Sequence, residues 1–422
     1  MVAAIASGQG KTSVCAALAR KLQEQGQRVT VFKTGADFID PLILQHAAHQ
    51  AVEVLDIWLL GEAACQQKLS AAAAQSDVVL IEGVMGLYDG NPSAADLARA
   101  FDIPVLLVID ASAMAQTVGA LVYGMQHFGN VKIAGVIANK VASSGHAAFI
   151  ASSLRECPLL GYLPPQKSCL PERHLGLVLP DEVGGLDHIL QELADGLQLD
   201  REKWDSIATS VLPPQLTPTV PPLLQGKTIA VARDAAFAFI YPANIACLQA
   251  LGAHIVYFSP LANQAIPFTA DALYLPGGYP ELHAATIAQA KRWQASLRAA
   301  QGAGMPIWAE CGGMMALVEH LIDKTGRSYS MAGLLPGTVR MHSRLGALGP
   351  QAWQVEHGQL RGHTFHFSSY YTNLAPHAHA QQHPNGHEGE AIYRLAQLQA
   401  SYFHAYFPSN PVATAALFGV PA

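Results

Sequence analysis

The sequence predicts two α/β domains in one chain, each built on a parallel sheet with helices on both faces. Both halves alternate short apolar runs with longer helical stretches rich in alanine and leucine. Continuous apolar strands separated by helices are typical of parallel sheets that are covered on both sides. At 422 residues the chain is also longer than one ordinary hydrophobic core supports.

A proline-rich segment separates the two halves. Five prolines lie between Leu212 and Pro222, and proline is excluded from helix interiors and central strands. We therefore predict a first domain over 1–211, a semi-rigid linker over 212–226 and a second domain over 227–422. The expected strands are 29–32, 78–81, 105–109 and 133–137 in the first half, and 229–232, 254–258, 272–275 and 306–309 in the second.

Composition argues against several classes of protein. Hydrophobic residues make up 50% of the chain, charged residues 13%, and the net charge is −6. No basic block suggests a nucleic-acid partner, and no apolar run is long enough to span a membrane. We expect a soluble protein in the reducing cytoplasm. Four histidines lie close together, His377, His379, His383 and His387. The Pro, Asn and Gly between them favour a solvated surface loop over a metal site.

The first domain begins with a phosphate loop, Gly-Gln-Gly-Lys-Thr over 8–12. Small residues let backbone N–H groups cradle phosphates at a helix N-terminus, while the lysine reaches the outer phosphates and the threonine hydroxyl binds Mg²⁺. The usual leading glycine is missing, with Ala4 or Ile5 in its place. The start therefore looks shortened, which puts the first strand's stability in doubt, and a chance Gly-Lys-Thr is the alternative. The residues expected to bind ATP are Gly8, Gly10, Lys11, Thr12 and, at the end of a later strand, Asn139.

Acidic residues beyond the ends of expected strands argue against chance. Glu82 follows the apolar strand 78–81, as a Walker B carboxylate does. Ligands bind outside the carboxyl ends of strands in open α/β sheets, so these acids predict a magnesium–nucleotide site. Any one of them could be an ordinary loop acid, and an Asp before proline favours turns. We expect Mg²⁺ at Thr12, Asp37 and Glu82, and the substrate at Asp37, Asp40 and Asp89.

The second domain carries a cysteine in the setting of a nucleophile. A strand runs into Cys311 and two glycines, as at a sharp strand-to-helix turn, and the following helix is expected to favour thiolate. His404 is a candidate base, and Gly277 and Gly278 offer backbone N–H groups to an oxyanion on the substrate. The alternative is a buried structural cysteine. We expect that role for Cys15, Cys65, Cys157, Cys169 and Cys247.

Three motifs of this half resemble the class I glutamine amidotransferase domain of the cobyric and cobyrinic acid synthases. They are Pro-Gly-Gly-Tyr-Pro-Glu-Leu-His (276–283), Ala-Glu-Cys-Gly-Gly (309–313) and Ser-Tyr-Phe-His (401–404). The segments 35–41 and 82–90 resemble the companion ATP domain, a relative of dethiobiotin synthetase. They point to the cobyrinic acid a,c-diamide synthase family, and the resemblance covers nearly the whole chain. It implies a P-loop NTPase-like parallel sheet followed by a class I amidotransferase α/β domain.

The resemblance implies a ligase of cobalamin biosynthesis that uses ATP, Mg²⁺ and glutamine. A carboxylate cannot accept ammonia directly, because its oxygen is too poor a leaving group, so ATP converts it to an acyl phosphate. Cys311 attacks glutamine, and His404 relays the proton. The implied substrate is a corrin-type tetrapyrrole, amidated at its a and c acetates. Hydrogenobyrinic acid and nickel-sirohydrochlorin are alternative substrates for the same chemistry. An alternative of another class is a regulatory P-loop protein with a glutaminase-like domain.

One departure from the amidotransferase pattern concerns the acid of the catalytic triad. Ordinary class I amidotransferases carry a glutamate two residues after the catalytic histidine. In this chain Tyr406 stands at that position, as is also the case in the cobyrinic branch. The sequence therefore leaves open what orients His404.

Overall fold

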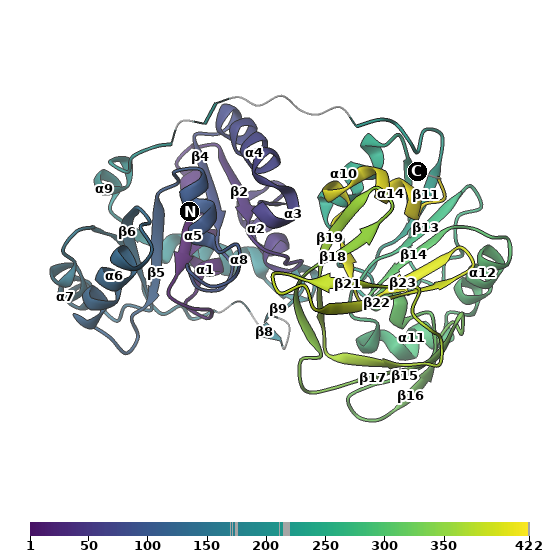
Figure 1. The fold of residues 1–422 in the computed structure, drawn as a ribbon. Helices are drawn as coiled ribbons and strands as arrows, with labels where there is room; N and C mark the ends of the chain where they lie inside the picture. Colours follow the sequence, from purple (N-terminus) through teal and green to yellow (C-terminus); the bar gives the residue numbers. More distant parts are fainter. Residues whose placement is uncertain (169, 171, 174–175, 211, 214–219, 421–422) are drawn as a thin grey trace. The chain divides into compact units, whose positions relative to one another are not determined.

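The computed structural model describes the whole chain except residues 169, 171, 174–175, 211, 214–219 and 421–422 (Figure 1). It divides into two compact units, Met1–Thr217 and Pro218–Ala422. Part of the predicted linker, 214–219, lies outside the described residues. Leu224, near the end of that linker, is fully buried in a core cluster of the second unit. The described helices are all too short or too polar to cross a bilayer.

Unit 1 is built on an eight-stranded sheet in the order β10-β7-β6-β5-β1-β4-β2-β3. All its neighbours are parallel except β10 and β7. The short β1, which precedes the phosphate loop, pairs with both β4 and β5. It therefore lies inside the sheet, with a neighbour on each side. The strands are β1 (Val2–Ala4), β2 (Val29–Lys33), β3 (Glu53–Val54), β4 (Val78–Glu82), β5 (Val105–Asp110), β6 (Ile133–Asn139), β7 (Leu159–Leu163) and β10 (Gln198–Leu199), with a separate antiparallel pair β8 (Glu172–Arg173) and β9 (Gly176–Leu177).

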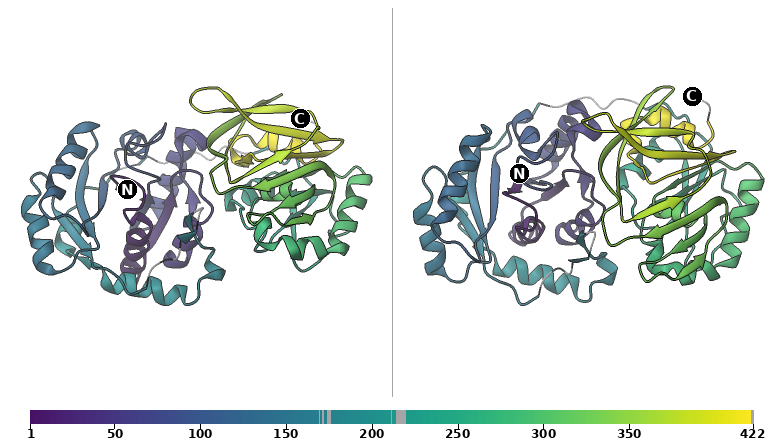
Figure 2. Two further views of the ribbon diagram at one scale, coloured as in Figure 1. Left: turned by 90° about the horizontal axis from the view of Figure 1, so that it is seen from below. Right: turned by 60° about the horizontal axis from the view of Figure 1, so that its bottom comes forward.

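Helices cover both faces of this sheet (Figure 2). Side chains of α4, α5, α6 and α7 share one buried cluster with Ala3, Ile81 and Leu107. Successive strand residues point to opposite faces, so the buried Ala4 and Leu80 face the other layer, where α1 packs against α2 and α8. The helices are α1 (Lys11–Glu24), α2 (Asp40–Ala48), α3 (Ile57–Leu60), α4 (Glu62–Gln75), α5 (Ala94–Ala100), α6 (Thr117–Phe128), α7 (Ser144–Ser153), the 3₁₀ turn η1 (Pro180–Glu182), α8 (Leu186–Gly196) and α9 (Arg201–Asp205).

Unit 2 contains a ten-stranded mixed sheet in the order β12-β11-β13-β14-β23-β22-β21-β18-β19-β24. The four strands predicted from apolar runs, together with β23, form the parallel half. The remaining neighbours are antiparallel, so the expectation of a parallel sheet holds for one half of this sheet and not for the other. Parallel-sheet runs are apolar throughout, whereas these antiparallel strands carry exposed polar residues and give a weaker pattern.

The strands of the large sheet are β11 (Thr228–Ala232), β12 (His254–Phe258), β13 (Ala272–Leu275), β14 (Ile307–Glu310), β18 (Ala347–Val355), β19 (Gly358–His366), β21 (Ala378–Gln382), β22 (Glu388–Leu395), β23 (Leu398–Ser401) and β24 (His404–Ala405). A smaller sheet has the order β16-β15-β17-β20, formed by β15 (Val318–Ile322), β16 (Ser328–Ser330), β17 (Leu335–Met341) and β20 (Ser368–Tyr371). The helices are α10 (Pro242–Ala250), η2 (Pro280–His283), α11 (Ala284–Gln289), α12 (Lys291–Gly302), α13 (Gly312–Met315), η3 (Phe407–Ser409) and α14 (Pro411–Leu417).

The histidine-rich segment expected to be a surface loop is largely exposed, but it contributes the strand β21 and the turn into β22. Within it, His379 Nδ1 lies 3.4 Å from Glu388 Oε2 of the neighbouring strand. In the described part of the chain, no group of three or more His, Cys, Asp or Glu side chains is arranged to hold a metal ion.

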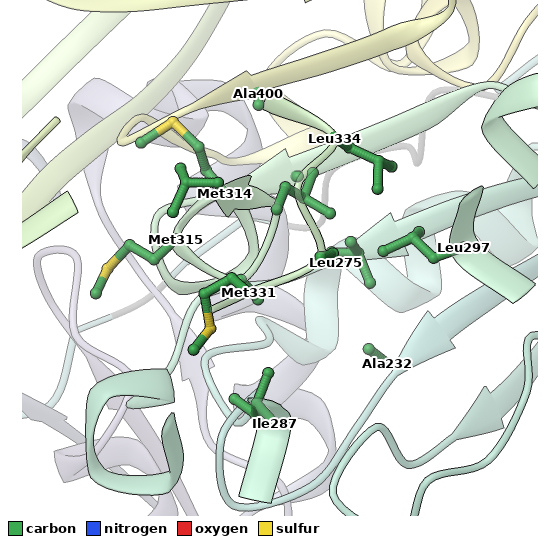
Figure 3. Packing of buried hydrophobic residues seen from close by; sticks show 14 of the residues in the cluster. Ala232, Leu275, Ile287, Leu297, Met314, Met315, Met331, Leu334 and Ala400 are labelled. Carbon is green, nitrogen blue, oxygen red and sulfur yellow. The ribbon is translucent and has the colours of Figure 1, made fainter. Parts of the chain in front are cut away.

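A dense apolar cluster supports the turn that follows β14. Met314 and Met315, which come directly after the Cys-Gly-Gly sequence, are buried in the same cluster as Leu275 of β13 and Leu297 of α12 (Figure 3). Each such side chain stabilises the folded state by roughly 1.5–3 kcal/mol. The cysteine turn is therefore anchored at its downstream end by core packing.

Candidate active sites

The topology of unit 1 brings the phosphate loop and its predicted acids to one edge of the sheet. The loop connects β1 to α1, Glu82 is the last residue of β4, and Lys33 is the last residue of β2. β4 pairs in parallel with both β1 and β2. Because all three strands end at the same edge, their carboxyl-terminal residues meet there.

These residues form one hydrogen-bonded cluster. Thr12 Oγ1 donates to Glu82 Oε1 at 2.7 Å, and Asp40 Oδ2 lies 3.3 Å from the same hydroxyl. Lys33 Nζ donates to the same two carboxylate oxygens, at 2.9 Å each. Asp37 Oδ2 lies farther from Lys33 Nζ, at 4.0 Å. Four of the predicted site residues are thus gathered around a lysine that sequence reasoning had not assigned to the site.

Lys33 is the residue that sequence reasoning missed. It is only 2% exposed, and its charge is compensated by three acids. Burial lowers the pKa of Lys33, but Glu82, Asp40 and Asp37 outweigh that effect and raise it overall. The sequence did hold one sign of this role: Lys33 is a charged residue at the end of an apolar strand, and charged residues are rarely buried unless they are paired.

The acids of this cluster respond differently to burial. Burial raises the pKa of Glu82, and Lys33 only partly offsets that rise. For Asp40 the charge and hydrogen bond of Lys33 outweigh burial, so its pKa is lowered. Burial and the neighbouring Asp40 raise the pKa of Asp37 to about 7. Two cations, Lys33 and Lys11, act on these carboxyl groups, and burial keeps the pKa values of two of the three raised.

A cavity of about 520 Å³ opens over the cluster and the phosphate loop. Gly10 has φ +87°, and a Cβ there would come within 2.1 Å of Asn139 Nδ2. Asn139 Nδ2 itself donates to Gln9 O at 3.0 Å and so braces the loop. Its predicted contact with an adenine edge stays a prediction. Predicted residues that line the cavity are Gly8, Gly10, Lys11, Thr12, Asp37, Asp40, Glu82 and Asn139.

Asp89 does not line this cavity. Its Oδ2 accepts a hydrogen bond from Gly86 N at 2.9 Å, which closes the turn after β4. Asp89 instead lines a second cavity, of about 470 Å³, with Tyr88 and residues of α6. Asp37 and Asp40 thus line the phosphate-loop cavity, whereas Asp89 does not, although its charge acts on Lys11 and it shares the second cavity with Ile5.

In unit 2, three adjacent parallel strands carry the three predicted motifs. β13 ends at Leu275, just before Gly277, and β14 ends directly before Cys311. β23 pairs with β14 and ends at Ser401, three residues before His404. The nucleophile, the candidate base and the glycine motif are therefore placed together by strand order.

Cys311 has the strained backbone of a nucleophile at a sharp turn. Its φ is +43° and its ψ is −103°, and its N–H donates to Ser401 O at 2.7 Å. A Cβ at Gly312 would lie 2.8 Å from Gly278 N, and one at Gly313 would lie 2.1 Å from Leu275 O. The two glycines are required because the turn packs directly against the backbone of the motif after β13.

The thiol and the imidazole are both deeply buried. Burial raises the pKa of the Cys311 thiol, and the nearby Glu281 and Glu390 add to the rise. Burial has the largest effect on His404 and, together with the nearby His363 and His366, lowers its pKa well below the usual range. The expected thiolate at a helix N-terminus was wrong, since α13 has only four residues and burial dominates. Both shifts favour the uncharged forms, and a neutral imidazole is the form in which His404 can act as a base.

The other cysteines fit the structural role expected for them. Four are buried free thiols, and Cys169 lies outside the described residues. Burial raises the pKa of each thiol for which a shift is resolved. The buried thiols are Cys15, Cys65, Cys157 and Cys247.

Gly277 lies against the imidazole of His404, because a Cβ at this position would come within 2.3 Å of His404 Cε1. We expect Gly277→Ala to displace the ring and to lower the rate of glutamine hydrolysis on the order of a hundredfold, since misplacement by about 1 Å has effects of that size. Ammonia release from glutamine measures it. Gly302→Ala, at a glycine with no atom near the added methyl, is the control and should hydrolyse glutamine normally. A normal rate in Gly277→Ala would refute this placement of His404.

Comparisons with known proteins match both units. A CobQ/CobB/MinD/ParA nucleotide binding domain matches residues 1–178, and a CobB/CobQ-like glutamine amidotransferase domain matches residues 228–412. A cobyrinate a,c-diamide synthase of Herminiimonas arsenicoxydans is 54% identical, over 99% of this chain and 96% of that protein. Hydrogenobyrinate a,c-diamide synthases of Stutzerimonas stutzeri and Pseudomonas aeruginosa are 49% and 48% identical, over 99% of this chain and 97% and 96% of theirs.

Proposed function

The chain belongs to the family of cobyrinate and hydrogenobyrinate a,c-diamide synthases, and we propose that it amidates the a and c acetates of cobyrinic acid with nitrogen from glutamine. It is an amide-forming ligase with a nucleotide-binding domain and a glutamine amidotransferase domain, not a regulatory P-loop protein. The observation that carries the proposal is the pairing, in one chain, of an acid-lined phosphate loop with a buried Cys–His site.

We propose that unit 1 activates the carboxylate. Lys11 holds the outer phosphates of ATP, and backbone N–H groups of the loop hold the rest. Hard oxygen ligands suit Mg²⁺, and the Thr12 hydroxyl and the Glu82 carboxylate already lie 2.7 Å apart at the loop, with Asp37 nearby. When bound, Mg²⁺ neutralises charge that develops during phosphoryl transfer. Asp40 and, from its separate cavity, Asp89 are proposed to lie nearer the macrocycle.

We propose that unit 2 releases ammonia from glutamine. His404 takes the proton of Cys311, the sulfur attacks the side-chain amide, and the imidazolium returns the proton to the departing nitrogen. The backbone N–H groups at Gly277 and Gly278 are proposed donors to the oxyanion on the amide carbon. Water then hydrolyses the thioester and frees the cysteine.

Hydrogenobyrinic acid is the second candidate substrate, because two of the similar relatives carry that name at 49% and 48% identity. Both macrocycles present the same acetates, so the chemistry is unchanged. Turnover of the two compounds, measured side by side with glutamine and ATP, distinguishes them. Amidation of cobyrinic acid with higher kcat/KM supports the main proposal, and amidation of neither macrocycle would overturn it.

We expect Glu82→Gln to raise the Mg²⁺ concentration needed for half-maximal amidation by about tenfold or more, and to lower turnover. The substitution removes a buried negative charge that contacts Thr12 and Lys33. Glutamine hydrolysis should remain detectable, since its residues lie in unit 2. Glu62→Gln, the same change at an exposed position of α4, is the control. An unchanged Mg²⁺ dependence in Glu82→Gln would remove Glu82 from the metal site.

A further inference from the structure

The glutaminase site lacks the acid that ordinarily follows the catalytic histidine. Tyr406 occupies that position, is fully buried, and packs edge-on against the ring of Tyr241, with the ring centroids 5.3 Å apart. His363 stacks on His404, with centroids 4.9 Å apart. Burial lowers the pKa of His363 to about 3, so this ring stays neutral beside His404 and supplies no negative charge.

A carboxylate approaches His404 from a different strand. Glu310, the residue immediately before the nucleophile, is 1% exposed, and its Oε2 lies 3.9 Å from His404 Nδ1. The same Oε2 accepts a hydrogen bond from Tyr274 Oη at 2.8 Å. Its other oxygen, Oε1, accepts from Trp308 Nε1 at 2.7 Å and from the backbone N–H of Ala405 at 3.0 Å.

These contacts hold the histidine in two ways. The bond from Ala405 fixes the backbone at the residue after His404, where β24 pairs with β19. The bonds from Tyr274 and Trp308 fix the carboxylate itself, because both donors come from buried, neighbouring parallel strands of the large sheet. Oε2, held in this way, is the oxygen that lies 3.9 Å from His404 Nδ1.

We propose that Glu310 is the positioning residue of the glutaminase site and takes the place of the acid that Tyr406 replaces. Its carboxylate favours the tautomer with the proton on His404 Nδ1, which leaves Nε2 to accept the thiol proton. It also compensates the imidazolium while the sulfur attacks the amide carbon. Glu310 takes no proton in this step: the proton passes from sulfur to Nε2 and then to the departing ammonia. This inference rests on the proposed glutaminase role of Cys311.

The 3.9 Å separation is longer than a hydrogen bond, as is common for catalytic contacts before substrate binds. Burial raises the pKa of Glu310 to about 7, while the three donated hydrogen bonds act in the opposite direction. A neighbouring imidazolium favours the ionised carboxylate further, so the two charges stabilise each other.

Other acids near the site have different partners. Glu390 accepts from Thr364 Oγ1 at 2.8 Å and lies 3.0 Å from His366 Nε2. Glu281 acts on the Cys311 thiol, and burial raises its own pKa to about 7. Six titratable groups among the described residues interact electrostatically with Cys311 or His404: Glu281, Glu310, His363, His366, Glu390 and Tyr402.

The test is Glu310→Gln, which keeps the shape and removes the charge. Its readouts are the kcat for glutamine hydrolysis and the pH midpoint of Cys311 alkylation by iodoacetamide. We expect kcat to fall on the order of 10² to 10⁴, as when a triad acid is replaced by its amide, with little change in KM for glutamine. We also expect the alkylation midpoint to rise, because the thiolate–imidazolium pair loses its compensating charge.

The direction of the midpoint shift separates this role from a general field effect. A carboxylate acting on the thiol raises the thiol pKa, as Glu310 itself also does, so the loss of that effect alone would lower the midpoint. Glu390→Gln, the same change at an acid that acts on Cys311 directly, is the matched control and should lower the midpoint. A lowered or unchanged midpoint in Glu310→Gln, with kcat within threefold of the unmodified protein, would overturn the proposal.

Glu310→Asp covers the case in which the glutamine variant folds poorly. A merely structural role makes aspartate at least as damaging as glutamine, because glutamine keeps an oxygen that can accept from Trp308 and Ala405, whereas the shorter aspartate moves both oxygens. We expect Asp, which keeps the charge, to retain at least tenfold more kcat than Gln, and equal losses would contradict the inference. If the unmodified protein hydrolyses no glutamine, the proposed function has failed rather than this role.

Discussion

Lys11→Ala is expected to stop amidation with glutamine and with ammonium alike. Lys11 lines the phosphate-loop cavity, and its Nζ donates to Ala6 O within the loop, at 3.3 Å. Without this ammonium the charge on the transferring phosphate is not compensated, so no acyl phosphate forms for either nitrogen source. Loss of such a contact costs several kcal/mol of transition-state stabilisation, on the order of a hundredfold or more in rate. Steady-state amidation with each nitrogen source measures it.

The matched control is Lys132→Ala, which removes an exposed lysine paired with Asp102 outside the cavity lining. This variant should amidate normally. Glutamine hydrolysis should persist in both variants, because Cys311 and His404 belong to unit 2. If Lys11→Ala turned over with ammonium at a near-normal rate, the phosphate-loop assignment would be wrong.

Cys311→Ala is expected to abolish glutamine-dependent amidation and to leave ammonium-dependent amidation largely intact. No other nucleophile is proposed for the glutamine amide, so the first loss should be complete within detection. High ammonium bypasses the thiol and reaches the activated carboxylate directly. Product formation with glutamine, and separately with ammonium, is followed by chromatography of the macrocycle.

Cys247→Ala is the control for this variant, since it removes another buried thiol of unit 2, on α10. It should keep both activities, because burial raises the pKa of this thiol and disfavours the nucleophilic thiolate. Loss of both activities in Cys311→Ala, with both kept in Cys247→Ala, would mean that Cys311 does more than release ammonia.

The sequence was most informative where backbone and chemistry are coupled locally. The phosphate loop, Glu82 and Cys311 each follow a short apolar strand, and parallel strands direct their ends to one edge. The glycines after Cys311 were readable for the same reason, since only a residue without Cβ fits that close approach. The family resemblance then gave each motif a chemical role.

Long-range contacts were not readable. The pairing of β23 with β14, which places His404 near the cysteine, joins residues about ninety positions apart in sequence. Lys33 and Glu310 look like ordinary residues of buried strands until their partners are known. The antiparallel half of unit 2 was missed because its strands are partly exposed and irregular in pattern. Asp89 was grouped with the other acids by spacing, although its side chain closes a turn.

The central claim is that unit 1 makes an acyl phosphate that ammonia then attacks. Cobyrinic acid with ¹⁸O in its a and c carboxylates tests this most directly, when it is incubated with ATP and glutamine. If an acyl phosphate forms, one carboxylate oxygen leaves with each phosphate, and ³¹P NMR will show one ¹⁸O per inorganic phosphate for each amide made. Unlabelled phosphate during amidation, or label recovered in AMP, would contradict the account.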